Sequence, residues 1–393
     1  MIDSLYIHYP FCRHLCNYCD FYKLKQTESN RTHQQKLFQD HLSSSLRILQ
    51  ENVHEPNGFT FGKLKTLYIG GGTPSLLGLS GVEWLLNFLK MQSIQFDLNP
   101  GELEFTLEID PGTVNEEMLK NLKAQNVNRF SFGLQTLNEG LIDIADRKTD
   151  VSDIRKCLSW MKDLKVNYSV DFLLGIPKSQ KRNVIKELEE ILLYGPSHIS
   201  LYILNPKTNY PLKNFMPEDE QVAKEYLDVH DFLVFNGFRH YEVSNYARPG
   251  FEGRHNLGYW GRRSSAALGP SAAGLLNRLD DGSASEFQVS KRYQWASHLK
   301  APQYTLESLT MEQIWLEQLY LETRLDKGFT IQSLIPPNIK DASREKYLNK
   351  VLNTLDQWIE NQQLIKNFVH ENVLYQFTSH GWVVLDSLIK KLI

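Results

Sequence analysis

The chain has 393 residues, of which 41% are hydrophobic and 23% are charged, and its formal net charge at pH 7 is -3. This composition is that of an ordinary globular protein with room for two or three domains, and the near balance of charge argues against a general nucleic-acid binder. Three of the four cysteines are clustered, which excludes a disulfide framework and favours a cytoplasmic location. We expect neither a signal peptide nor a transmembrane segment, because no apolar run approaches about 18 residues.

Strand-like and helix-like segments alternate six times across the first half of the chain. The strands are expected at residues 5–9, 65–69, 103–109, 129–134, 166–174 and 198–204, with helices between them. Such alternation predicts an α/β fold of parallel strands joined by helical crossovers. Polar and glycine residues follow several of the strands, and in barrels the carboxyl ends of the strands form the rim where chemistry is assembled. The pattern therefore favours a partial (β/α)6 barrel over a doubly wound sheet.

The repeat breaks at residue 206. A helix is expected at 217–235, then a strand at 237–246 and a loop rich in glycine, arginine and aromatic residues. Two amphipathic helices (312–325 and 344–361), a hairpin (364–378) and a last helix from 381 give the order of a winged-helix-like α+β module. It carries no basic stripe, so we expect it to pack or bind a partner. The expected domains are a core barrel at 1–205, a connecting segment at 206–300 and a C-terminal module at 301–393.

The first strand is followed by Cys12, Cys16 and Cys19 at the spacing C-x3-C-x2-C. Three thiolates this close can bind one metal centre, but they leave a four-iron cube one ligand short. An iron without a protein ligand can bind a small molecule directly. The alternative is a structural zinc site with His8 or His14 as the fourth ligand.

Polar groups at the ends of the later strands suggest how such a molecule is held. The second strand runs into the glycine run 70–72, which lets backbone groups approach a ligand or simply makes a tight turn. Glu108, Gln135 and Asp171 fall at or near the ends of successive strands and supply acceptors for ribose hydroxyls or an ammonium group. A single residue of this kind is ordinarily a helix cap or a surface group, but the three together indicate a pocket.

The cysteine motif, with GGGTP after the second strand, resembles the radical S-adenosylmethionine (SAM) superfamily, and most of the chain resembles its coproporphyrinogen-oxidase-like branch. The resemblance implies a [4Fe–4S] cluster on the three cysteines, with SAM closing the fourth iron and cleaved by one electron to a deoxyadenosyl radical. By position it implies SAM contacts at Tyr6, Tyr18, Gly71, Gly72, Thr73, Glu108, Gln135, Arg147 and Asp171. The segment Arg147-Lys148 departs from the arginine-x-histidine that the family often shows.

Two features separate the branches of this family. Oxygen-independent coproporphyrinogen oxidases carry a further cysteine two residues after the third, where this chain has Phe21. The run from His255 to Trp260 resembles the HNxxYW signature of HemW-type haem chaperones. A histidine can ligate haem iron, and Tyr259 and Trp260 offer flat faces to a porphyrin. Arginines that could pair with haem propionates are Arg254, Arg262 and Arg263.

The sequence therefore predicts a haem chaperone with a [4Fe–4S] cluster, SAM and haem as its cofactors. Its expected partners are acceptor haemoproteins, respiratory ones among them, and peripheral association with a membrane is compatible with the sequence. The alternative is an oxygen-independent coproporphyrinogen III oxidase. Whether SAM is cleaved, and which of the 12 histidines ligates haem, stay open at this point, although His255 is the candidate. Cys157 lies at an apolar helix position and is expected in the core.

Overall fold

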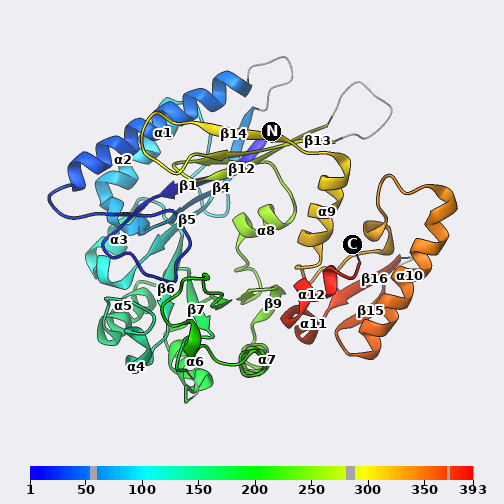
Figure 1. The fold of residues 1–393 in the computed structure, drawn as a ribbon. Helices are drawn as coiled ribbons and strands as arrows, with labels where there is room; N and C mark the ends of the chain where they lie inside the picture. Colours follow the sequence, from blue (N-terminus) through cyan, green and yellow to red (C-terminus); the bar gives the residue numbers. More distant parts are fainter. Residues whose placement is uncertain (54–59, 180, 280–287, 370–371, 393) are drawn as a thin grey trace.

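The computed structural model describes residues 1–53, 60–179, 181–279, 288–369 and 372–392. Within them, the largest feature is a 12-stranded sheet in the order β14-β13-β12-β11-β1-β4-β5-β6-β7-β8-β10-β9 (Figure 1). Its centre is an array of six parallel strands. They are β1 (Ile2–Tyr9), β4 (Phe61–Gly71), β5 (Glu104–Ile109), β6 (Arg129–Gln135), β7 (Tyr168–Leu174) and β8 (His198–Ile203). The predicted partial (β/α)6 barrel is confirmed.

Six helices connect these strands and cover the outer face of the array (Figure 1). They are α1 (Arg31–Val53), α2 (Gly78–Met91), α3 (Glu116–Ala124), α4 (Glu139–Ile142), α5 (Val151–Asp163) and α6 (Val184–Leu192). Asn115 and Asn183 are the N-cap residues of α3 and α6, and each side chain accepts a backbone N–H from the first turn of its helix. Apolar residues at helical spacing then turn one face of each helix to the core. Cys157 of α5 is fully buried there, as predicted.

The segment after α7 (Asp219–Phe235) differs from its prediction. The expected strand at 237–246 is two short strands, β9 (Arg239–Glu242) and β10 (Asn245–Ala247), and the expected loop contains helix α8 (Arg254–Trp260). Four further strands extend the sheet on the other side of β1: β11 (Ser265–Leu268), β12 (Ala273–Leu279), β13 (Gln288–Trp295) and β14 (Tyr304–Ser308). The sequence pattern missed β11 because this strand is only four residues long and is stabilised by parallel pairing with β1, far away in sequence.

The C-terminal module lies to one side of the main sheet, drawn orange to red in Figure 1. Its elements are α9 (Met311–Glu322), α10 (Asp341–Glu360), β15 (Leu364–Val369), β16 (Asn372–Phe377), α11 (Ser379–Val383) and α12 (Leu385–Ile389). This is the predicted order of two helices, a hairpin and a helical end, around a hydrophobic cluster of its own. Trp382 of α11 contacts the ring of His240 at a centroid distance of 4.3 Å, which joins the module to the barrel. The domain boundaries at residues 205 and 300 stay predictions.

Inside the barrel, β1 and β4 present paired side chains in successive layers. Residues two apart on a strand point to the same face, and the register of the two strands places these residues side by side. The pairs are Ser4 with Thr66, Tyr6 with Tyr68, and His8 with Gly70. A hydroxyl layer therefore lies at the amino ends of the strands, an aromatic layer above it, and the glycine run at the rim. No helix in the described part of the chain is long and apolar enough to cross a bilayer.

Candidate functional site

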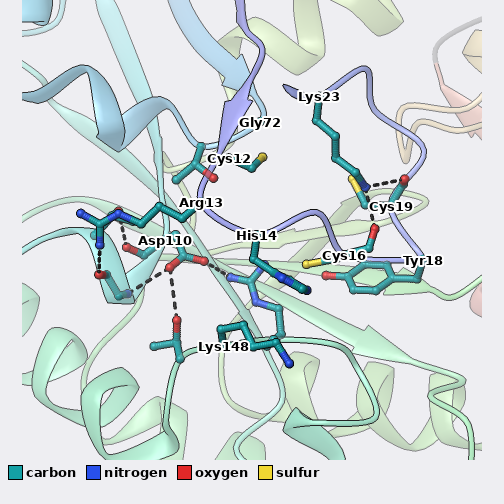
Figure 2. Close-up of a pocket in the computed structure, with 15 residues that line it drawn as sticks. Cys12, Arg13, His14, Cys16, Tyr18, Cys19, Lys23, Gly72, Asp110 and Lys148 are labelled. Carbon is teal, nitrogen blue, oxygen red and sulfur yellow. Dashed lines mark hydrogen bonds and ion pairs between the residues drawn. The ribbon is translucent and has the colours of Figure 1, made fainter. Parts of the chain in front are cut away.

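The three clustered cysteines lie on one closed loop at the rim of the barrel. Two short parallel strands, β2 (Phe11–Cys12) and β3 (Leu24–Lys25), pair at its base. The N–H of Leu24 donates to the carbonyl of Pro10 at 2.7 Å, and the N–H of Gln26 donates to the carbonyl of Cys12 at 2.8 Å. Because both ends are tied together, the loop bends back and carries Cys12, Cys16 and Cys19 over the same cavity (Figure 2).

Polar contacts fix the loop from within and from outside. The ammonium group of Lys23 donates to the carbonyls of Cys16 and Cys19 at 2.7 and 2.8 Å, as Figure 2 shows. On the outer side, the Asp146 carboxylate accepts the N–H of Asn17 at 2.9 Å. Lys23 therefore holds two of the cysteine carbonyls together and places a positive charge beside the thiols. The sequence analysis missed this residue, although a lysine four residues after a cluster cysteine is a visible signal.

Both histidines of the zinc alternative have other hydrogen-bond partners. His8 lies between the Tyr6 hydroxyl, 3.0 Å from Nδ1, and the Tyr22 carbonyl, 2.8 Å from Nε2. The Nε2 of His14 pairs with Asp146 at 2.8 Å. Across the described ranges, no group of three or more His, Cys, Asp or Glu side chains is arranged to hold a single metal ion. A mononuclear zinc site needs four such ligands within bonding distance, so this geometry does not favour it.

The cavity beneath the loop has a volume of about 200 Å³. Its walls include all three cysteines and Lys23, together with residues from the neighbouring strand ends. Burial raises the pKa of the Cys12 thiol to about 11, although a hydrogen bond with the Thr73 side chain opposes the shift. A thiol with so high a pKa is a poor anion by itself, and a bound metal supplies the positive charge that deprotonates it. The donor set and the volume fit a metal cluster.

The glycine run at the end of β4 is required mainly by the packing of the chain itself. Gly71 has a φ of +113°, and a Cβ there would lie 2.6 Å from the ring of His8. A Cβ on Gly72 would lie 2.7 Å from the carbonyl oxygen of Phe11 and 3.0 Å from the sulfur of Cys12. Any larger residue would therefore push the cysteine loop away from the rim. The N–H groups of both glycines are already used by the protein, Gly71 by Glu108 and Gly72 by Tyr9.

A second cavity of about 440 Å³ adjoins the first and opens at the centre of the rim. Eight residues predicted from the resemblance line it: Tyr18, Gly71, Gly72, Thr73, Glu108, Gln135, Arg147 and Asp171. The ninth, Tyr6, is absent from the wall; it lies one layer deeper, with its hydroxyl against His8. The structure thus brings together eight groups that come from successive strands or the loops that follow them.

Two carboxyl groups on the wall of this cavity are half-buried and form no ion pair with the described residues. Glu108 accepts the Tyr68 hydroxyl at 2.9 Å and the N–H of Gly71 at 3.0 Å, yet burial raises its pKa to about 7. Burial likewise raises the pKa of Asp171 to about 6, against hydrogen bonds from Ser200 and Ser131. Carboxylates held in a low-dielectric cavity bind a cationic ligand strongly, because the ligand supplies the missing opposite charge.

Gln135 and Arg147 are fixed by the backbone around them. Gln135 adopts a φ of +71° at an irregularity in the pairing of β6 and β7, which ends the strand and directs the residue to the cavity. The Arg147 guanidinium pairs with Asp110 and donates to the carbonyl of Gly133 at 3.1 Å. Burial alone would lower the pKa of Arg147, but the Asp110 carboxylate raises it. Arg147 is therefore a permanent cation between the two cavities.

Sequence reasoning missed Tyr68 and Tyr202, which also line the larger cavity. Tyr68 donates to Glu108 and so positions this carboxylate. Tyr202 is 44% exposed and borders the mouth of the cavity. Both lie on the inward face at even spacing, Tyr68 two residues before Gly70 and Tyr202 two residues after Ser200, so strand alternation could have identified them.

His255 does not lie at the rim. It belongs to α8 and sits at the opposite end of the barrel strands, half-buried, with its ring 5.1 Å from the ring of Tyr68. Its Nδ1 lies 3.1 Å from the Ser4 hydroxyl and 3.0 Å from the Thr66 hydroxyl. No residue in the described ranges forms a hydrogen bond with its Nε2. Burial and the nearby Arg263 lower the pKa of His255 to about 4, so the imidazole is neutral at pH 7.

Two of the three arginines expected to pair with propionates have other roles. Arg262 is 5% exposed and forms an ion pair with Glu317 of α9 at 2.7 Å. The guanidinium of Arg254 donates to the carbonyls of Gly101 and Glu102 at 2.8 and 3.1 Å. That expectation was therefore wrong for Arg262, because the sequence did not show its partner on α9.

Similarity to known proteins identifies the family of the chain. The family model of the radical SAM superfamily matches residues 6–191. The chain is 34% identical over 282 residues to the haem chaperone HemW of Lactococcus lactis, covering 70% of each chain. It is 28% identical over 395 residues to HemW of Haemophilus influenzae, covering 98% of this chain and 97% of that one.

Among solved structures, the coproporphyrinogen III oxidase HemN of Escherichia coli superposes with a TM-score of 0.70 at 20% identity. The match covers 99% of this chain and 89% of the oxidase. At this identity the likeness shows a common fold. The sequence matches are more specific, and by them the chain belongs to the HemW family of the radical SAM superfamily.

Proposed function

We propose that this protein is a haem chaperone. It would hold a [4Fe–4S] cluster and SAM at the rim of the barrel, bind haem through α8, and pass the haem to acceptor haemoproteins, respiratory ones among them. The state of His255 carries the proposal. Its imidazole is neutral, two hydroxyls hold its Nδ1, and no residue in the described ranges forms a hydrogen bond with its Nε2. An imidazole in this state can bind haem iron without first losing a proton.

The residues at the rim of the barrel support the proposed binding of a [4Fe–4S] cluster and SAM. Cys12, Cys16 and Cys19 would ligate three irons of the cluster, and Lys23 would hold the loop that carries them. The larger cavity offers Glu108 and Asp171 to the cationic and hydroxyl groups of SAM, which would also reach the fourth iron. A reduced cluster bound at these cysteines would supply an electron to the sulfonium group of SAM. The residues themselves bind, orient and neutralise the ligand.

Phe21 supports the chaperone over the oxidase. It borders the larger cavity and is 64% exposed, so its position is close to the cofactors but carries no thiol. The oxidases that the chain resembles have a further cysteine at the matching position. On α8, Tyr259 is 58% exposed and offers an aromatic face beside the haem motif. The cytoplasm and peripheral contact with a membrane remain the expected places of haem transfer.

The cluster can be tested by anaerobic reconstitution. The protein should take up about four irons with the broad visible absorption of a [4Fe–4S] cluster, and Cys16→Ser should lose most of this iron because one of three ligands is gone. Cys157→Ala is the matched control, since this cysteine is buried in α5 away from both cavities. One bound zinc and no iron would contradict the assignment.

The charge of Glu108 can be tested with Glu108→Gln. The pKa of this carboxyl rises from 4.5 in the unfolded chain to about 7 in the folded protein, so the folded state binds the proton more tightly. The protonated carboxyl therefore adds to the free energy of unfolding below about pH 4.5. This contribution, up to about 3 kcal/mol, is lost as the pH rises through 7. Between pH 5 and pH 8 the cofactor-free variant should lose less free energy of unfolding than the parent, as measured by denaturant titration.

The same variant should bind SAM about 10-fold more weakly after reconstitution, because it lacks a charged acceptor. Glu83→Gln, on the exposed side of α2, is the control. If Glu108→Gln matches the parent in both measurements, the carboxylate neither titrates nor contacts SAM as proposed.

Haem titration tests the proposed function directly. The protein should develop a Soret band that His255→Ala weakens, whereas His33→Ala, on the exposed side of α1, should leave the affinity unchanged. An unchanged affinity in His255→Ala would move the ligand elsewhere. The reduced, reconstituted protein should also leave coproporphyrinogen III unaltered in the presence of SAM, and formation of protoporphyrinogen would favour the oxidase.

A further inference from the structure

Helix α8 is attached firmly to the amino ends of the barrel strands. The buried carboxylate of Glu104, at the start of β5, accepts the N–H of Arg254 at 2.8 Å and the N–H of His255 at 2.9 Å. The Tyr241 hydroxyl accepts the N–H of Gly253, the residue before the helix, at 3.2 Å. These contacts satisfy N–H groups in the first turn, which have no partner within the helix. The backbone that carries His255 is thereby fixed relative to the barrel.

The imidazole of His255 then meets a pair of hydroxyls. Ser4 and Thr66 are register partners on β1 and β4, and their hydroxyl oxygens lie 2.7 Å apart. The Nδ1 of His255 completes a triangle with them, at 3.1 Å from Ser4 and 3.0 Å from Thr66. Both residues are buried, at 6% and 2% exposure, so water competes little for these hydrogen bonds. Both hydroxyls contact the same ring nitrogen, Nδ1.

We propose that Ser4 and Thr66 are positioning residues that fix the Nδ1–H tautomer of His255 and so reserve the lone pair of Nε2 for haem iron. This inference rests on the proposed function, in which His255 receives haem. The hydroxyl oxygens accept the Nδ1 proton, and Nε2 donates its electron pair to the iron, so no proton has to leave when the bond forms. Histidines that ligate metals generally donate their second N–H in this way, which fixes the ring and increases its basicity.

The neighbouring residue Thr106 provides a matched control. Its hydroxyl lies in the same polar interior, on β5, and is buried at 1% exposure, but it has no hydrogen-bond partner among the residues that the structure describes. Thr106→Val therefore removes a buried hydroxyl of the same kind without touching His255. Thr66→Val makes the same chemical change at a hydroxyl that contacts the imidazole.

The test compares haem binding by Thr66→Val, Thr66→Ser, Thr106→Val and the double variant Ser4→Ala/Thr66→Val. Loss of an acceptor should weaken haem binding about 10-fold in Thr66→Val and up to about 100-fold in the double variant. The iron–imidazole stretching frequency of the ferrous complex, measured by resonance Raman spectroscopy, should fall in both. Thr66→Ser, which keeps the hydroxyl, and Thr106→Val should both behave like the parent.

The outcomes separate the two proposals. If His255→Ala weakens haem binding but Thr66→Val and the double variant keep the parental affinity and stretching frequency, the positioning role is wrong and the haem site stands. If His255→Ala binds haem as the parent does, the haem site itself is wrong. Thermal unfolding identifies a double variant that does not fold, in which case the isosteric Thr66→Val variant carries the test.

Discussion

The parallel pairing of β1 and β4 is the constraint on which both ends of this molecule depend. At their carboxyl ends, the chain leaves β1 into the cysteine loop and leaves β4 through the glycine run, and the close contact between Gly72 and Cys12 requires the two to meet. At their amino ends, the same register places Ser4 beside Thr66 and against His255 of α8. Ser4 and His8 are four residues apart, or about 13 Å along the strand. One pair of strands thus sets the separation of the cluster loop from His255.

The electrostatics of the rim follow from burial. Glu108 and Asp171 are held in the barrel by neutral hydroxyl and amide donors, and Arg147, which lines the same cavity, is already paired with Asp110. Their raised pKa values reflect a negative charge that the protein leaves uncompensated. A ligand that carries a positive charge would lower both pKa values on binding. The site is therefore suited to a cationic molecule beside a metal centre.

The features of this fold that depend on residues close together in the chain could be predicted from the amino-acid sequence. The cysteine motif, the alternation of strands and helices, and the end-of-strand position of Gln135 all depend on short-range patterns. The helix at α8 and the strand β11 could not be predicted, because α8 is stabilised by Glu104, about 150 residues earlier, and β11 by the edge of β1. The ion pair of Arg262 with Glu317 likewise depends on a contact between distant segments.

The central claim, that haem bound at α8 is handed to another protein, is tested most directly by a transfer measurement. The anaerobically reconstituted protein is loaded with haem, separated from free haem, and mixed with an apo-haemoprotein whose Soret band is distinct. We expect the Soret band of the acceptor to appear as that of the donor declines, faster than from haem bound to serum albumin. Haem that stays with the donor, or that leaves only at the albumin rate, would show that this protein does not deliver haem.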